Sequence, residues 1–438
     1  MNILIQHGRV VDPASGFDHV ADVAVADGHI VAIAKAGEKL PANFKADHTI
    51  DAKGCIVAPG LVDLQVRLRE PGYEHEGMLA SELTAAVAGG VTSLVCPPDT
   101  DPVLDEPGLV EMLKFRAEKL HRARVFPLGA LTVGLKGEVL TEMSDLTDAG
   151  CVGFSQAEVP LENTQVLQRA LQYAATFGYT VWLRPQEIHL GKGVAASGPL
   201  ATRLGLGGVP VAAETIALHT IFALMRSTKA RVHLCRISSA EGVELVRAAK
   251  KEGLAVTADV SINSLHLSDH DIGYFDSRAR VTPVLRQQRD RDALRTALAD
   301  GTLDVLVSDH TPIDIDGKTL PFAEAEPGAT GLELLLSLSL KWAHDSKVSL
   351  LRAIDVLTSQ PAKVLGKIEG QSASMGQLHV GGVADVVVFD PAVEWQVTPD
   401  ALHSQGKHTP FAFDMTGMAL PARVKATLVA GRVAYQAA

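Results

Sequence analysis

The stretch PGLVDLQVRLREPG, residues 59–72, contains the first of several apolar runs that decide the fold. The run at 61–68 is short, and turn residues flank it, which is the pattern of a buried strand. Similar runs recur at intervals of roughly 25 to 50 residues, as strands of a parallel sheet do when crossover segments separate them. They are TSLVCPP (92–98), RVFPLGAL (124–131), GCVGFS (150–155), YTVWLRP (179–185), RVHLCRIS (231–238), LAVTADVS (254–261) and LDVLVSD (303–309).

Segments with helical periodicity lie between these runs. Examples are EGMLASELTAAVAGG (76–90), NTQVLQRALQYAATFG (163–178), SAEGVELVRAAKKEG (239–253) and RDRDALRTALADG (289–301). Alternation of buried strands with helices predicts an α/β protein with a parallel sheet. Eight strands, counting 61–68 as the first, close into a (β/α)₈ TIM-like barrel.

Both ends of the chain are rich in β-type runs broken by Gly, Asp and Pro. The N-terminal runs lie at 3–13, 21–34 and 48–59, and the C-terminal runs at 383–391 and 422–436. We expect the two ends to meet in one small β-sandwich domain. The predicted division is residues 1–57 and 369–438 for the two parts of the sandwich and 58–368 for the barrel.

Composition excludes several classes of protein. The 438 residues are 47% hydrophobic and carry a formal charge of −11, which argues against nucleic acid or an anionic membrane as the main partner. The four cysteines form no CxxC pair, so we expect small core residues in a reduced, cytoplasmic protein. No secretory signal or transmembrane run is recognisable. The glycine-rich stretch at 204–210 lacks the GxGxxG pattern and predicts a surface loop.

Several ordered motifs resemble those of bacterial dihydroorotases, amidohydrolases that interconvert carbamoyl-aspartate and dihydroorotate. Besides residues 59–72, they are GGVTSLVCPPDTDPVLD (89–105), DAGCVGFS (148–155), LVSDHTP (306–312), LPFAEAEPGATGLELLL (320–336), TSQPAKVLG (358–366) and GQLHVGGVADVVVFD (376–390). The resemblance implies a barrel with a metal centre at the carboxyl ends of its strands and a small β-sandwich from both termini.

The same resemblance implies that the metal ligands are almost all lost. The two positions of the family's HxH pair hold Gln65 and Arg67, and further ligand positions hold Gln156, Arg184 and Arg236. Arginine stays protonated and has no lone pair to give to a cation. A metal would be needed to bring the pKa of a bound water towards neutrality. Of the six ligand positions only Asp309 is retained, so we expect no metal, no cofactor and no catalytic residue.

Substrate-binding positions are also partly changed. The resemblance places Arg69, Asp99, Asn263 and Ser264, and the retained His310, at such positions. Asp99 would repel a substrate carboxylate by roughly 1 to 4 kcal/mol. Glu158 lies beyond the lost acidic ligand positions.

Three of the lost ligand positions hold arginine, which suggests that guanidinium groups replace the charge of the metals. We expect them to pair with Asp99 or Asp309, to fill the former metal pocket and to hold it shut, because an unpaired buried charge costs several kcal/mol. The alternative is that these arginines reach solvent. Another alternative is a metal site rebuilt from other histidines, although no two of them form an HxH or HExxH pair. The histidines expected near loops or strand ends are His75, His189, His233, His266 and His270.

The resemblance is most specific to an inactive dihydroorotase-like chain that assembles with the catalytic chain of aspartate carbamoyltransferase, six copies of each. It implies a non-catalytic role in pyrimidine biosynthesis and contacts between copies of this chain. Two other classes stay open. One is an active amidohydrolase with altered metal use, and the other is a module that binds an anion or metabolite in the arginine-lined cavity.

Overall fold

A computed structural model of the chain describes residues 1–35, 37–368, 375–412 and 417–437. Its main part is a barrel of parallel strands in chain order, in which β8 continues directly into β9. The ring closes where Val66 pairs with His310 and the Arg67 amide donates to the His310 carbonyl oxygen at 2.8 Å. The strands are β6 (Leu61–Asp63), β7 (Val91–Cys96), β8 (Arg124–Pro127), β9 (Gly129–Ala130), β10 (Phe154–Ser155), β11 (Thr180–Leu183), β14 (Arg231–Leu234), β15 (Val256–Ser261) and β16 (Val305–Val307).

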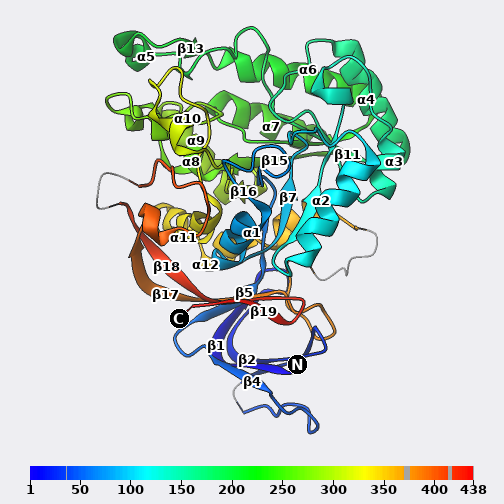
Figure 1. Cartoon of the computed structure of the whole chain (residues 1–438), viewed down its shortest axis with the longest axis vertical. Coiled ribbons are helices and arrows are strands. Elements are labelled where there is room, and N and C mark those ends of the chain that lie inside the picture. The colour runs from blue at the N-terminus through cyan, green and yellow to red at the C-terminus, as the bar shows by residue number, and fades with distance from the viewer. Residues whose placement is uncertain (36, 369–374, 413–416, 438) are drawn as a thin grey trace.

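Helices surround the barrel, as Figure 1 shows. The longer ones are α1 (Leu79–Ala88), α2 (Pro107–Lys119), α4 (Thr164–Phe177), α6 (Ala212–Thr228), α7 (Ala240–Glu252), α9 (Gln288–Asp300) and α11 (Leu335–Ser346). The shorter ones are α3 (Met143–Asp148), α5 (Pro199–Leu204), α8 (Ile262–His266), α10 (Ile315–Thr319), α12 (Leu350–Asp355) and α13 (Ser359–Leu365). The four segments predicted as helical contain α1, α4 and α7 and all of α9 except its first residue, so the alternation of strands and helices predicted from the sequence is confirmed.

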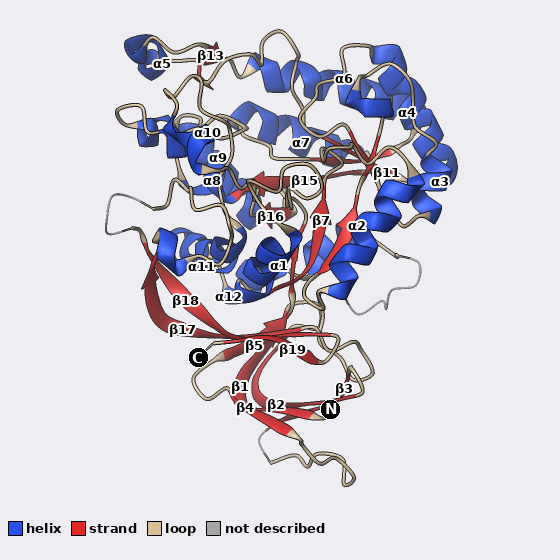
Figure 2. Cartoon of the chain, viewed as in Figure 1, coloured by secondary structure: helices blue, strands red, loops and turns tan. Residues whose placement is uncertain are grey.

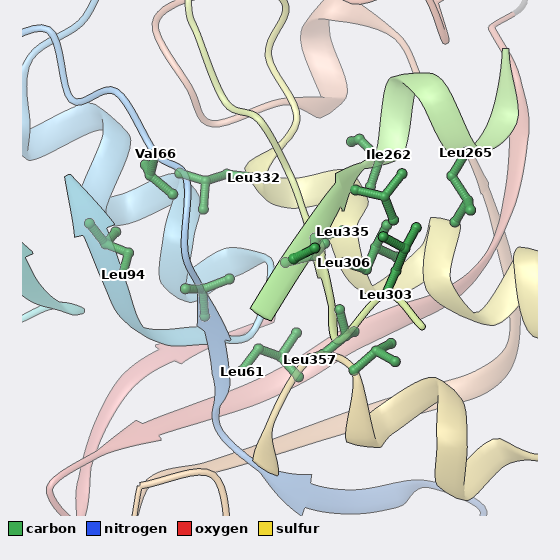
Figure 3. Packing of buried hydrophobic residues seen from close by; sticks show 14 of the residues in the cluster. Leu61, Val66, Leu94, Ile262, Leu265, Leu303, Leu306, Leu332, Leu335 and Leu357 are labelled. Atoms are coloured by element: carbon green, nitrogen blue, oxygen red, sulfur yellow. The ribbon is translucent and has the colours of Figure 1, made fainter. Parts of the chain in front are cut away.

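Leucine-rich packing joins the barrel strands to the helices. Leu61, Leu94 and Leu306 come from three strands, are fully buried and belong to one apolar cluster with Leu335 of α11 and Leu357 (Figure 3). Strands buried on both faces need apolar side chains in nearly every position, which is why these runs do not alternate with polar residues.

The two ends of the chain form a second, β-rich domain below the barrel (Figure 2). Its strands make one continuous sheet in the order β19-β18-β17-β5-β1-β2-β3, and β4 pairs with β1. The strands are β1 (Ile3–Asp12), β2 (Phe17–Ala26), β3 (His29–Lys35), β4 (His48–Asp51), β5 (Ile56–Pro59), β17 (Val386–Gln396), β18 (Ala419–Val429) and β19 (Arg432–Gln436). Ile3 and Val57 from one end of the chain pack with Val388 and Leu428 from the other in a core of their own.

The sequence predicted two limits between the barrel and the β-rich domain, at 57–58 and at 368–369. The limit at 57–58 lies inside β5, because this strand completes the sheet before the chain enters β6. The limit at 368–369 lies at the edge of the described residues.

The stretch at 204–210 ends α5 and forms the two-residue strand β13 (Gly208–Val209), which pairs with β12 (Ala195–Ala196). Within the described part of the chain, no helix has both the length and the apolar character needed to cross a bilayer.

Candidate functional site

The barrel strands deliver charged side chains to one end of the barrel. Arg184 follows β11 directly, Arg236 and Asp309 come two residues after β14 and β16, and Arg67 and Glu158 follow β6 and β10. Carboxyl ends of parallel strands meet at the same mouth, where barrel proteins place their functional groups. Arg236 and Asp309 also have positive φ values, 57° and 53°, which non-glycine residues adopt rarely and which are enriched at functional sites.

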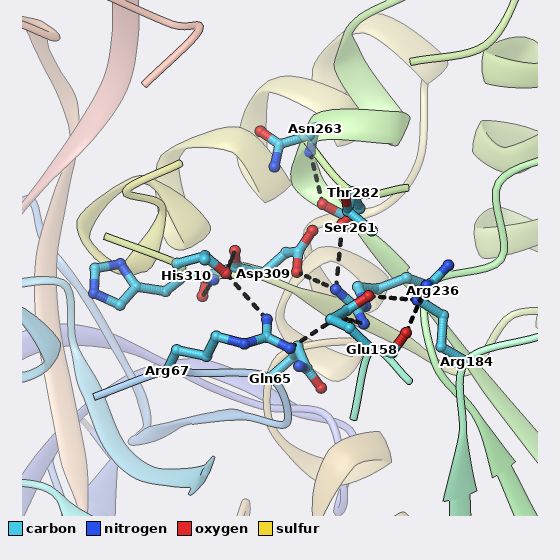
Figure 4. A network of polar contacts seen from close by, with 12 residues as sticks. Gln65, Arg67, Glu158, Arg184, Arg236, Ser261, Asn263, Thr282, Asp309 and His310 are labelled. Carbon is cyan, nitrogen blue, oxygen red and sulfur yellow. Dashed lines mark hydrogen bonds and ion pairs between the residues drawn. The ribbon is translucent and has the colours of Figure 1, made fainter. Parts of the chain in front are cut away.

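Glu158 is the common partner of the three arginines that the family resemblance places at metal-ligand positions (Figure 4). Its Oε1 lies 2.8 Å from Arg67 Nη2, and its Oε2 lies 2.5 Å from Arg184 Nε. Arg236 Nη2 also donates to Glu158 Oε1. The family motif assigns no role to Glu158, since this residue lies beyond the acidic positions of the motif. Only the bend of the chain after β10, where Ala157 has a φ of 50°, brings it among the arginines.

Two aspartates complete the neutralisation. Arg67 Nε lies 2.8 Å from Asp99 Oδ2, and Arg67 Nη1 donates to Thr311 Oγ1 at 3.1 Å. Arg236 Nη1 lies 3.0 Å from Asp309 Oδ1. The pairing with Asp99 and Asp309 expected from the sequence is therefore present, and Asp99 is bound to a cation rather than facing the cavity as a free anion.

Burial and charge together set the protonation of this cluster. The side chains of Arg67, Arg184 and Arg236 are 6%, 6% and 2% exposed, so the alternative in which they reach solvent is wrong. Burial disfavours ionisation of Glu158, but attraction from Arg184, Arg236 and Arg67 outweighs it and holds the pKa of Glu158 well below its usual range. Burial raises the pKa of Asp309, although Arg236 and Arg67 oppose the shift.

This donor set does not fit a divalent metal. Glu158 and Asp309, the carboxylate that the resemblance places at a ligand position, are both already paired with arginine nitrogens. Three guanidinium groups in the same space would repel a cation, and none can coordinate one. We therefore derive no reaction step through a metal at this mouth.

One other group of possible metal ligands exists among the described residues. His233, Cys235 and Asp259 place one ligand atom each within 4.8 Å of one another. The ring nitrogens of His233 are already bonded to Thr257 Oγ1 at 2.8 Å and Asp259 Oδ2 at 2.9 Å. Asp259 Oδ1 also accepts from the Arg236 amide at 2.7 Å, so this group holds the backbone of Arg236 in place.

The remaining histidines considered from the sequence offer no second set. His266 is buried and its Nε2 lies 2.9 Å from the Leu338 carbonyl oxygen, whereas His75, His189 and His270 are exposed.

Some predicted site residues lie at the mouth without facing its cavity. Gln156 turns away, accepting from Thr132 Oγ1 and donating to the Leu135 carbonyl oxygen. His310 also points away from the cavity, with its Nε2 2.8 Å from Glu82 Oε2. Gln65 is buried beside Arg67 (Figure 4).

Three of the other substrate-site positions, Arg69, Asp99 and Asn263, line the cavity. Arg69 lines it but is bound to Glu76 at 2.7 Å and to the Pro312 carbonyl oxygen at 2.9 Å. Asn263 lines it too, and its buried Oδ1 has no hydrogen-bond partner in the described structure. Ser264 is buried outside that lining.

The expectation that the arginines hold the pocket shut is wrong. A cavity of about 460 Å³ remains at the mouth, and Arg67, Arg184 and Arg236 are part of its wall. The cause is that Glu158 and the aspartates draw the guanidinium groups against the strand ends, which leaves the space above them open.

An eight-stranded α/β barrel with its polar cluster at the strand ends, joined to a β-rich domain from both termini, is an amidohydrolase architecture. The model of the amidohydrolase family matches residues 210–435, and that of the dihydro-orotase-like family matches residues 54–242. The chain belongs to the dihydroorotase-like family of the amidohydrolase superfamily, as the motifs indicated.

Relatives cover the whole chain. The dihydroorotase-like protein of Pseudomonas aeruginosa is 43% identical over 437 residues, which is 100% of both chains. That of Pseudomonas putida is 43% identical over 436 residues, 99% of each chain. A dihydroorotase of Geobacter sp. (strain M21) is 40% identical over 438 residues, again 100% of both.

Solved structures agree on the fold. L-hydantoinase (dihydropyrimidinase) from Arthrobacter aurescens superposes with a TM-score of 0.86 at 25% identity, covering 99% of this chain and 96% of that one. A D-hydantoinase gives a TM-score of 0.80 at 22% identity, covering 99% and 95%, and supports the fold alone.

Proposed function

We propose that this chain is a catalytically inactive dihydroorotase homologue that serves as a structural subunit. The observation that carries the proposal is the closed set of ion pairs at the former metal site. Arg67, Arg184 and Arg236 stand where electron-pair donors would be needed, and Glu158, Asp99 and Asp309 neutralise them. The chain thus stabilises its barrel mouth with fixed charges in place of metal ions.

The proposed partner is the catalytic chain of aspartate carbamoyltransferase, in an assembly of six copies of each chain that supports an early step of pyrimidine biosynthesis. This follows from the resemblance to an inactive dihydroorotase-like chain of that assembly. The name dihydroorotase-like protein carried by relatives at 43% identity is consistent with it.

Metal analysis and an activity assay test the first half of the proposal. The protein is purified with zinc in the growth medium, its metal content is measured by mass spectrometry, and it is assayed with carbamoyl-aspartate and with dihydroorotate. We expect far less than one metal per chain and no turnover above buffer, beside an active dihydroorotase treated identically. Stoichiometric metal together with cyclisation of carbamoyl-aspartate would refute inactivity.

Co-purification tests the second half. The aspartate carbamoyltransferase of the same organism is expressed with a tag, alone and with this chain, and the complex mass is measured by analytical ultracentrifugation. We expect a complex with equal numbers of the two chains and higher transferase activity in the mixture than in the transferase alone. Separate sedimentation and unchanged activity would remove the structural role.

An active amidohydrolase is the second candidate. Retention of Asp309 and the name dihydroorotase of the Geobacter relative favour it. The assay above decides between the two, because an enzyme of this class needs turnover and a structural subunit does not.

A further inference from the structure

Arg280 lies at the barrel mouth without a charged partner among the described residues, unlike Arg67, Arg184 and Arg236. It lines the same cavity of about 460 Å³. Its Nε and Nη1 are buried without a hydrogen-bond partner, and no carboxylate of the described structure lies within ion-pair distance of it. Its backbone oxygen is already occupied by Lys318 Nζ at 2.9 Å. A guanidinium group that is partly removed from water and unpaired has lost solvation without compensation.

A second arginine of the same loop also lacks a carboxylate contact. Arg286 Nε donates to Ser238 Oγ at 2.8 Å and its Nη1 to the Val209 carbonyl oxygen at 3.3 Å, both neutral acceptors. The segment from Arg280 to Arg286 therefore gives this side of the cavity positive charge that the protein does not neutralise by direct contact. Arg67, Arg184 and Arg236 differ, because Glu158 and the aspartates balance them.

The cavity is large enough for an organic molecule. Its volume lies within the range of roughly 300 to 1,000 Å³ that is usual for small-molecule sites. The side chain of Asn263, with its unpaired Oδ1, lies in the same wall and offers a further polar contact. Such a wall suits a compact ligand that is anionic at one end.

We propose that this cavity binds a small organic oxyanion, a carboxylate or a phosphate ester, whose negative group pairs with the free guanidinium of Arg280. Guanidinium groups recognise both classes of anion through paired N–H donors. This inference goes beyond the structural role proposed above, and neither metal content nor assembly with a partner enters into it.

Isothermal titration calorimetry with simple anions tests the site. The probes are malonate for carboxylates, inorganic phosphate for phosphates, and malonamide as the neutral counterpart of malonate. The proteins are the full-length wild type, Arg280→Met, and Arg203→Met as a matched control, since Arg203 is an exposed arginine outside the cavity.

We expect saturable binding of malonate or phosphate by the wild type and Arg203→Met, and none of malonamide. We expect binding by Arg280→Met to be weaker by about tenfold or more, because a charge-assisted hydrogen bond is lost. Binding of only one anion identifies its class as the ligand class. Equal binding by Arg280→Met and wild type, or no saturable binding of either anion by the wild type, would overturn the proposal.

Labelling keeps the test decisive if Arg280→Met fails to fold. Phenylglyoxal modifies accessible arginines, and mass spectrometry reports modification at Arg280 and Arg203 separately in the wild-type protein. The anion that binds should slow modification of Arg280 without changing that of Arg203. Equal rates at Arg280 with and without a saturating anion would contradict the site. The result is independent of the metal, turnover and co-purification experiments, so the two proposals fail separately.

Discussion

Arg236 Nη1 lies 3.0 Å from Asp309 Oδ1, so a fixed cation holds the carboxylate that the resemblance predicts to be the one retained ligand. Both side chains are almost fully buried, at 2% and 4% exposure. A buried pair of this kind is costly to break because the remaining charge is left without solvent or partner. Substitutions in this cluster are therefore expected to change the free energy of unfolding.

Replacing Glu158 with Gln should destabilise the chain most among the mouth residues. The change removes the carboxylate shared by Arg67, Arg184 and Arg236. Loss of one partner of a buried pair costs about 3 to 5 kcal/mol of unfolding free energy. Because the side chain of Glu158 is 31% exposed, we expect a smaller loss of about 2 to 3 kcal/mol. Urea unfolding measures it.

Glu162→Gln is the control for that change, because Glu162 lies four residues later and its side chain is 73% exposed. We expect this control to stay within about 0.5 kcal/mol of the wild type. Equal loss in both variants would show that Glu158 does not balance the arginines.

Replacing Arg280 with Met should stabilise the chain in a buffer free of carboxylate and phosphate. Removing a partly buried, unpaired charge is expected to gain about 1 kcal/mol. Adding a bound anion should reverse the order, since a ligand stabilises only the protein that binds it. Thermal unfolding of wild type, Arg280→Met and Arg203→Met, each with and without malonate, shows this. A lower Tm for Arg280→Met in both conditions would contradict the prediction.

Asp63 should make the stability depend on pH. Its side chain is fully buried between β6 and β16, where Oδ1 accepts from the Ser308 amide at 3.2 Å and Oδ2 has no partner in the described structure. Burial raises the pKa of Asp63 to about 7 from an ordinary value of 3.8. Between these values the folded chain holds the proton and the unfolded chain does not, so this stabilisation is complete below pH 3.8 and is lost as the pH rises through about 7.

Asp63→Asn tests that dependence, because an amide cannot ionise. Unfolding free energies from pH 5 to 8.5 should fall with pH more steeply in the wild type than in the variant, by a difference of a few kcal/mol over the range. Asp51→Asn, at a position whose side chain is 70% exposed, is the control and should keep the wild-type slope. Parallel curves for wild type and Asp63→Asn would exclude a proton on Asp63 near neutrality.

Arg124 should connect the barrel to the β-rich domain. It stands at the start of β8, and its Nη1 and Nη2 lie 2.5 and 2.9 Å from the carboxylate of Asp385, just before β17. Asp385 Oδ1 also accepts from the Ala430 amide at 2.8 Å, after β18. Arg124→Met should cost about 1 to 3 kcal/mol and speed hydrogen exchange at 385–390 and 426–431. The exposed Arg432→Met should leave both unchanged; unchanged exchange in Arg124→Met would show that the pair does not join the domains.

The sequence by itself determined the barrel and the terminal β-rich domain, and its family motifs predicted the loss of the metal ligands. Apolar runs and helical periodicity are local properties, and the inability of Arg67, Arg184 and Arg236 to bind a metal is a property of the residue type. Their pairing with Asp99 and Asp309 could be expected because the family motifs place these residues at one mouth.

Only the tertiary structure decided which acid the three arginines share and which side chains point away from the cavity. It also decided which arginine lacks a carboxylate partner among the described residues. Glu158 meets Arg67 across 91 residues and Arg236 across 78. Gln156 and His310 point away from the cavity because partners from distant segments hold them, and Arg280 has no acid of the described structure within ion-pair distance. Such contacts depend on barrel closure and on the bends after each strand, which bring together groups that no local pattern relates.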